Sequence, residues 1–507
     1  MSDHQRRAHI ELDVNAGRVR TARVPDDDTP FRILVLGDLS ADRSRAGATS
    51  HTPLSNRHPI PVDRDTVDDV IAQVAPEIVL ERGSDEDVIV PIASIDDFHP
   101  DHLYDTLPLF RSLRAMRARL ANPATFAEAA RDLANDTRVA APESSESGAT
   151  PAPLPAPGHV LDAILGEPVP RVEPSGDALQ VLIRRAIEPY LVPAADPRQD
   201  ALIAQVDRAI AHAMRGVLHH RAFQALEAVW RSVWMLARRL ETDDHLEIHL
   251  LDVSAAELVS DLGDDSATDR SALRRIIVDG SDTPGARPWS LLVGAFTFGW
   301  DDADLVVLSR LGAIARACGA PFLAGAAPRL AGASAFDRTS DASEWSARAI
   351  PAWDALRVSP EAAYIGLAAP RFLARLPYGA GGDECDRFDF EELGAPYDHR
   401  EFLWANAAFA CAVLLAQSFS AAGWRMRPGS RRELTGLPYA LLRQNGDVQA
   451  KPCAEVLLTE RSSNRMLECG IMPLASLKDQ DAALLVRFQS IAQPVTALSG
   501  RWQAAQT

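Results

Sequence analysis

Residues 30–40 read PFRILVLGDLS and residues 57–70 read RHPIPVDRDTVDDV, and these two stretches decide the fold of the N-terminal part. The run FRILVL at 31–36 is largely apolar, as expected of a strand that is buried on both faces. A helix is predicted from about residue 63, with Asp65 as its N-cap. Its apolar face consists of valines and an isoleucine at helical spacing: Val67, Val70, Ile71 and Val74. The N-terminal part is therefore predicted to begin with a buried strand followed by an amphipathic helix.

The same patterns continue along the chain. They predict strands at 77–80 and 87–92, helical segments from 99 to about 133, a long helical region at 198–240, a strand at 246–252, a helix at 255–262 with Ser254 as N-cap, a strand at 289–296, a helix at 302–318 and a strand at 322–326. This succession of strands and helices predicts a mixed α/β fold with at least two domains. Trp230 and Trp234 lie four residues apart on one helix face, so we expect them in a core or a domain interface.

A linker divides the chain. Residues 140–158 read AAPESSESGATPAPLPAPG, in which Pro, Ala, Ser and Gly dominate and nothing is apolar enough to pack. We therefore predict one domain at 1–139, a Pro/Ala/Ser-rich linker at 140–158 and a second domain at 159–507.

Composition excludes several kinds of partner. The formal net charge is −18, which disfavours nucleic acid and anionic membranes because both attract basic surfaces. The N-terminus lacks the apolar core of a signal peptide, and no run of about 18 apolar residues was found that would span a membrane. The sequence predicts a cytoplasmic protein that does not insert into membranes.

The common catalytic motifs are missing from the sequence. It contains no GK[ST] phosphate loop, no GxSxG turn and no HExxH helix, and only two of its 52 basic residues are lysines. His245, Glu247 and His249 would share one face of a strand and could converge on a cation. The alternative is the polar outer side of a half-buried strand, and no fourth ligand is evident. We predict no catalytic residue, no cofactor and no metal, and hence a protein that is not an enzyme.

Several collinear motifs resemble a known family. In the N-terminal half they are a strand that ends in Leu36-Gly37-Asp38, the sequence Val62-Asp63-Arg64-Asp65 before a helix, and the turn Asp97-Phe98-His99-Pro100. These resemble the small subunit of the contractile sheath of bacterial type VI secretion systems. In the C-terminal half, residues 223–231 (FQALEAVWR), 246–254 (LEIHLLDVS) and 370–379 (PRFLARLPYG) resemble the large subunit of the same sheath. The chain thus resembles a fusion of the two subunits.

The resemblance implies a mechanical function. A sheath subunit polymerises around an inner tube and contracts to drive the tube outward, with other sheath subunits, the inner tube protein and the baseplate as partners. The alternative is a non-polymerising adaptor or assembly factor that docks at the sheath end or baseplate. The family's large subunit continues beyond the point that corresponds to Thr507, so we expect this chain to lack that C-terminal extension.

Two groups of residues are candidates for partner binding. In the family, a short helix near the beginning of the large subunit is captured by an AAA+ unfoldase that dismantles the spent sheath. The matching stretch carries an apolar stripe formed by Leu161, Ile164 and Leu165, which could instead pack onto its own domain. Arg371 and Arg375 lie four residues apart and are either satisfied surface charges or members of interface ion pairs.

Overall fold

The computed structural model describes the chain in separate stretches that form two compact units. The larger unit combines Met1–Leu109 with Ala211–Thr507, and the smaller comprises Phe110–Ile210. The described residues are 25–41, 52–81, 87–139, 196–263, 270–281, 287–336, 341–346, 350–394, 396–444 and 447–502.

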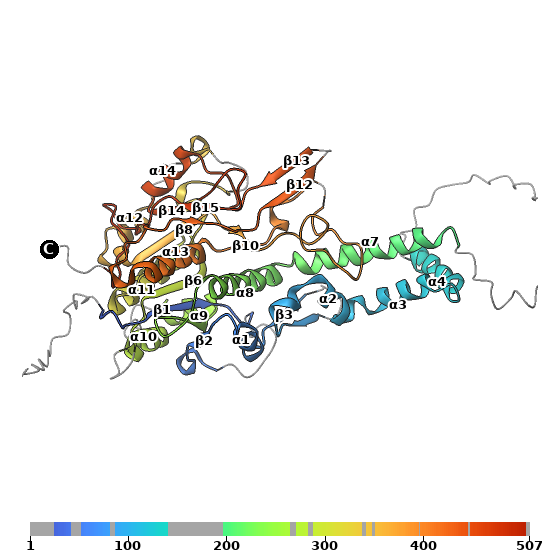
Figure 1. The fold of residues 1–507 in the computed structure, drawn as a ribbon, viewed down its shortest axis with the longest axis horizontal. Helices are drawn as coiled ribbons and strands as arrows, with labels where there is room; N and C mark the ends of the chain where they lie inside the picture. Colours follow the sequence, from blue (N-terminus) through green and yellow to red (C-terminus); the bar gives the residue numbers. More distant parts are fainter. Residues whose placement is uncertain are drawn as a thin grey trace, which may run out of the picture. The chain divides into compact units, whose positions relative to one another are not determined.

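A nine-stranded mixed sheet forms the centre of the larger unit, with the strand order β11-β15-β14-β8-β7-β6-β1-β5-β2 (Figure 1). Its strands are β1 (Phe31–Gly37), β2 (Ile60–Val62), β5 (Leu246–Asp252), β6 (Leu291–Phe298), β7 (Phe322–Ala326), β8 (Ile365–Ala369), β11 (Glu433–Leu434), β14 (Ile471–Ser476) and β15 (Ala483–Leu485). The strands from β14 to β5 run parallel, and antiparallel strands complete both edges. The predicted α/β class is confirmed.

Helices and three short two-stranded sheets surround this central sheet. The helices are α1 (Val67–Val74), α2 (Pro100–Thr106), α8 (Arg221–Arg239), α9 (Ala255–Leu262), α10 (Ala272–Ile277), α11 (Asp302–Cys318), α12 (Pro351–Arg357), α13 (Ala407–Ala422) and α14 (Glu460–Glu468). The short sheets pair β3 (Glu77–Leu80) with β4 (Val88–Pro91), β9 (Phe372–Leu373) with β10 (Trp404–Ala405), and β12 (Ala440–Gln444) with β13 (Asp447–Lys451).

Both faces of strand β1 are buried. Leu34 and Leu36 belong to a core cluster that also contains side chains of α9, α10 and α11. Because side chains alternate along a strand, Phe31 points to the opposite face, where its ring lies 4.9 Å from that of Phe419 in α13. Burial on both sides explains why residues 31–36 form an almost unbroken apolar run.

The smaller unit contains α3 (Arg111–Ala121), α4 (Phe126–Val139) and the first part of α7 (Gln199–Leu218). The Arg117 Nε lies 2.6 Å from the Asp207 carboxylate, and the Gln199 amide donates to the Leu120 carbonyl at 2.8 Å. Polar contacts therefore join α7 to α3 within this unit.

Most predicted elements agree with the structure; β6 begins and ends two residues later than predicted, and two other elements differ more. Strands β5 and β7 and helices α9 and α11 have the predicted bounds. The long helical region at 198–240 consists of two helices: α7 ends at Leu218, His219 and His220 are not helical, and α8 begins at Arg221. Helix α1 begins at Val67 with Thr66 as N-cap, so the prediction of Asp65 was wrong. The Asp63 carboxylate accepts the N–H groups of both Asp65 and Thr66 at 2.9 Å, and this turn delays the helix start.

One helical segment is longer and more apolar than we expected from the sequence. Residues 407–425, which include α13, have a mean hydropathy of 1.5 and are long enough to cross a membrane. The expectation that no run reaches that length was therefore wrong. However, 72% of this segment is buried inside the protein, with Phe409 and Leu414 fully inaccessible. A helix that is apolar all round is typical of a protein core, and α13 packs on the central sheet in that way.

Cleavage within residues 140–158 tests whether the two parts of the chain hold together without a covalent link. We expect the fragments to co-elute on gel filtration and to separate only in denaturant, because β1 is paired on both edges with strands from beyond the cut. Uncut protein under the same conditions is the control. Elution as two separate species would contradict the expectation.

Candidate functional site: the buried junction

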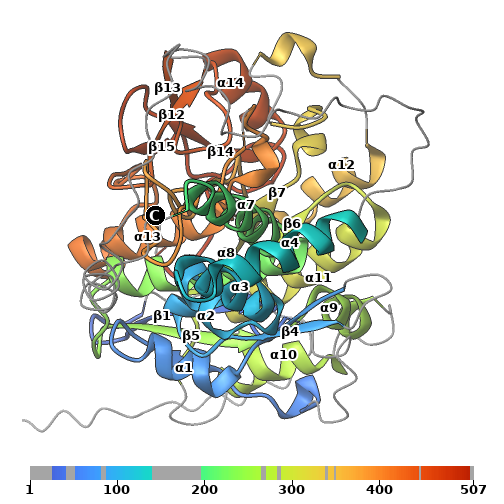
Figure 2. The same ribbon diagram turned by 90° about the vertical axis from the view of Figure 1, so that its right-hand side faces the viewer.

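Two parts of the chain that are far apart in sequence meet in the larger unit. Strand β1, from the N-terminal segment (residues 25–109), lies between β5 and β6 of the C-terminal segment (residues 211–502). Figure 2 shows β1 beside β5. Along β5 the register runs from Phe31 opposite Leu246 to Gly37 opposite Asp252. The junction is therefore a continuous hydrogen-bonded sheet as well as a packing contact.

The end of β1 is held by a tryptophan and an aspartate. Trp230, in α8, is fully buried, and its indole N–H donates to the Leu39 carbonyl at 3.0 Å. The Asp252 carboxylate accepts the N–H groups of Leu39 and Ser40 at 2.8 and 3.2 Å. The turn that follows β1 is thus fixed by the C-terminal segment. The predicted core position is confirmed for Trp230, whereas Trp234 is only half-buried.

Arg57 makes a second polar connection across the junction. Its guanidinium donates to the Asp252 carbonyl at 2.7 Å and forms two bonds to the Glu257 carboxylate at 3.0 and 2.6 Å. Glu257 also caps α9 together with Ser254. Burial alone would raise the pKa of Glu257, but the bonds from Arg57 and Ser254 lower it. This carboxylate therefore stabilises a helix start and a long-range contact together.

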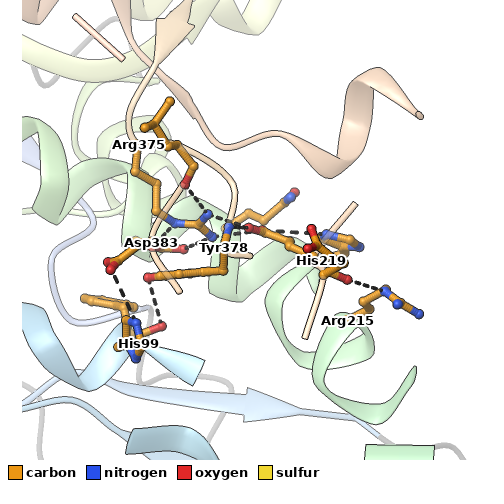
Figure 3. Close-up of polar contacts among 12 residues, drawn as sticks. His99, Arg215, His219, Arg375, Tyr378 and Asp383 are labelled. Atoms are coloured by element: carbon orange, nitrogen blue, oxygen red, sulfur yellow. Dashed lines mark hydrogen bonds and ion pairs between the residues drawn. The ribbon is translucent and has the colours of Figure 1, made fainter. Parts of the chain in front are cut away.

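A buried network of charges lies behind the junction (Figure 3). The Arg375 guanidinium contacts the carboxylates of Glu227 and Glu392 at 2.7 and 2.6 Å. All three side chains are less than a tenth exposed. Arg231 adds a second cation, with its Nε 2.6 Å from Glu227. One buried and one partly buried arginine thus balance two buried glutamates, as charges removed from water require.

The surroundings keep both Arg375 and Glu392 ionised. Burial acts to lower the pKa of Arg375, yet the neighbouring Glu227 and Glu392 raise it well above the usual value. Burial likewise acts to raise the pKa of Glu392, whereas Arg375, His219 and the backbone lower it to about 2. Arg375 and Glu392 are therefore both charged across the physiological pH range.

Tyr378 joins this network to the N-terminal segment. Its backbone N–H donates to Glu392 at 2.8 Å, and its hydroxyl accepts a bond from Arg231 at 2.8 Å. The hydroxyl also donates to the Phe98 carbonyl over a long 3.5 Å contact. Its ring lies under the Arg375 guanidinium, 4.0 Å from centroid to carbon. Burial raises the pKa of this tyrosine, which therefore stays protonated as a donor.

Helix α2 contacts the loop that follows Tyr378. The ring of His99 meets that of Tyr378 edge to face at 4.9 Å, and its Nε2 lies 3.7 Å from Asp383 (Figure 3). The Asp101 carboxylate accepts the backbone N–H groups of Asp386 and Arg387 at 2.9 and 3.2 Å. The loop is therefore held by the N-terminal segment.

Strand β5, which carries the alternating His and Glu residues, binds the Arg32 side chain. Glu247 accepts a bond from Arg32 at 2.7 Å and lies 3.0 Å from His249, while His245 is exposed. Burial lowers the pKa of His249. Among the described residues there is no group of three side chains that could hold a metal ion.

The predicted partner-binding residues have different surroundings. Arg375 is buried in the network above, whereas the Arg371 side chain is half exposed and contacts Glu455 at 2.6 Å. Leu161, Ile164 and Leu165 lie outside the described residues. Sequence reasoning missed Glu227, although a glutamate on the apolar face of α8 between Phe223 and Trp230 is a signal for a buried partner.

Truncation of Trp230 tests the junction's core. Trp230→Ala removes a fully buried ring and the bond to Leu39, so we expect a loss of about 3–5 kcal/mol in the free energy of unfolding. Denaturant titration measures it. Trp234→Ala is the matched control, since Trp234 lies one turn along the same helix, is only half-buried and should cost less. Equal losses would show that Trp230 has no special role.

Removal of Arg375 tests the charge network. Arg375→Met leaves two buried glutamates facing each other without their shared cation, which should cost about 3–5 kcal/mol of unfolding free energy. The control is Arg400→Met, because Arg400 is exposed and its solvent-screened pair with Asp398 should contribute little to stability. Partial recovery in the triple variant Arg375→Met, Glu227→Gln, Glu392→Gln would assign the loss to unpaired charge.

Comparison with known proteins matches both parts of the chain. The family model of the VipB/EvpB tail sheath N-terminal domain matches residues 200–492. The model of the type VI secretion system protein VipA matches residues 2–138. A type VI secretion system sheath protein, TssC1 of Pseudomonas aeruginosa, is 31% identical over 348 residues, which cover 65% of this chain and 70% of that protein.

These matches favour a sheath subunit over the adaptor that the sequence left open. The VipA match covers the segment that supplies β1, and the VipB match covers the segment that supplies β5 and β6. The chain belongs to the type VI secretion system sheath family, as a structural subunit in which the small-subunit and large-subunit parts are joined in one polypeptide.

Proposed function

We propose that this chain polymerises in the bacterial cytoplasm into a contractile sheath around an inner tube, and that contraction drives the tube outward. The observation that carries the proposal is the insertion of β1 between β5 and β6, which makes the two sheath parts one folded body. Such a body can move as a rigid unit while its contacts with neighbouring subunits change. The role is mechanical, and no chemical step is assigned to any residue.

Contraction requires subunit interfaces with two alternative packings, whereas the interior of each subunit must stay intact. The buried network around Arg375 supports this division, since separation of its charges would expose unpaired ions to a poorly solvating interior. Arg371 has the opposite character. Its guanidinium is half exposed beside Glu455, and Arg371 is therefore our candidate for an ion pair with a carboxylate of a neighbouring subunit.

Fusion of the two parts has a consequence for assembly. Separate subunits must find each other before they polymerise, whereas a covalent link gives each part a high effective concentration of the other. Each subunit added to the sheath then carries both parts in a fixed one-to-one ratio. The baseplate is the proposed site at which the first subunits dock.

Electron microscopy of the co-expressed secretion cluster tests polymerisation. We expect a tag on this chain to label tubules continuously along their length. A Phe31→Asp variant is the control, because a charge in the fully buried centre of the junction should abolish folding and hence labelled tubules. Label at only one end of each tubule would contradict the proposal and support an adaptor.

Recycling by an AAA+ unfoldase is tested with a peptide. A peptide of residues 158–170 carries the stripe of Leu161, Ile164 and Leu165, and we expect it to capture the N-terminal domain of the unfoldase in a pull-down. The same peptide with Leu161→Asp and Leu165→Asp should lose capture, because charges disrupt the apolar face. If both peptides behave alike, this stretch has no such role.

A further inference from the structure

A small cavity lies away from the junction, between α12, α14 and the turn around Arg329. Its volume is about 210 Å³, and both helices are labelled in Figure 1. That is space for several water molecules, or for a compact group of several non-hydrogen atoms. Nothing in the proposed sheath function uses this cavity.

One residue of the cavity lining is a largely buried cation, Arg357, on which Asp354 acts only at longer range and without an ion pair. Arg357 is only 6% exposed, and its Nε donates to the Ile491 carbonyl at 2.8 Å. Among the described residues no carboxylate forms an ion pair with it, and its terminal nitrogens have no hydrogen-bond partner. Burial lowers the pKa of this arginine, as expected for a poorly compensated charge.

A second unused donor lines the same cavity. Trp353 is 3% exposed, and its indole N–H is buried without a hydrogen-bond partner in the described part of the chain. Buried polar groups are nearly always paired with protein or with a bound molecule. The Trp353 N–H is therefore a buried donor without an acceptor, and the accessible end of the Arg357 guanidinium lies on the same helix; together they point to an acceptor that the described chain does not supply.

The other charged residues of the cavity lining are more exposed than Arg357. Arg329 is exposed, and Arg465 makes only a long contact of 3.6 Å with Glu468. The two acids of the lining, Asp354 and Glu468, are also exposed, so water screens them. Arg357 is the most buried charged residue of the lining. Arg375 shows the contrast, because that buried guanidinium has two carboxylates of its own.

We propose that this cavity binds a compact oxyanion, a phosphate or carboxylate group, through the Arg357 guanidinium and the Trp353 indole N–H. Arg329 and Arg465 add attraction at the mouth. An oxyanion supplies several acceptors to a planar guanidinium and would satisfy both donors. The group comes either from a free anion or from an acidic side chain of a second copy of this chain.

Calorimetric titration of the full chain with inorganic phosphate, at constant ionic strength with chloride as the reference salt, tests the site. We expect saturable binding that Arg357→Gln weakens by about tenfold or more, as loss of a charge-assisted bond predicts. Trp353→Phe keeps an aromatic side chain but removes the five-membered ring of the indole with its N–H, so it should weaken binding without loss of the fold. Arg432→Gln, an exposed arginine outside the cavity, should bind phosphate as the unmodified chain does.

Acetate in the same titration probes a carboxylate, and sedimentation velocity distinguishes the two sources. A free anion leaves self-association unchanged when phosphate is added. A side chain of a second copy predicts that phosphate and Arg357→Gln each shift the chain towards smaller species. Absence of saturable binding of both anions, or equal binding by Arg357→Gln and Arg432→Gln, overturns the proposal.

Discussion

Strand β1 is hydrogen-bonded on both edges to strands more than two hundred residues later in the chain, and the rest of the larger unit depends on that pairing. A strand between two parallel neighbours must satisfy its backbone groups on each side and present apolar side chains to both faces. Phe31, Leu34 and Leu36 meet the second requirement, and β5 and β6 meet the first. Without β1, the edges of β5 and β6 that now pair with it would have unpaired backbone N–H and C=O groups.

The polar contacts of the junction add to this pairing and fix the register of β1. Hydrophobic burial alone would tolerate a shift of register, because neighbouring positions of β1 are similarly apolar. The bonds from Trp230 and Asp252 to the turn after β1 accept one register only. Arg375 and Tyr378 do the same for the loop that contacts α2. Apolar burial stabilises the junction, and buried polar groups specify it.

Local sequence patterns predicted most of the helices and strands, but they could not predict which distant segments these would contact. Helix α9 was predicted with correct bounds because Ser254 and Glu257 form a capping box that is visible in sequence. The position of β1 in the sheet could not be predicted by periodicity, since nothing in FRILVL names its neighbours. The partners of Arg375 lie 148 and 17 residues away, and spacing had paired it only with Arg371. The resemblance of the two halves to the small and large subunits of one sheath, in contrast, indicated that the halves belong together.

The order of strands also has a consequence for synthesis. Arg32 and its partner Glu247 are separated by 215 residues, so β1 leaves the ribosome about 10 to 40 seconds before β5 at usual bacterial elongation rates of about 5–20 residues per second. During that interval an apolar strand with high β propensity has no neighbour, which is a known aggregation hazard. In a polypeptide that carries both parts, the waiting time is set by translation alone. In a two-chain system it would be set by diffusion and by the concentration of the partner.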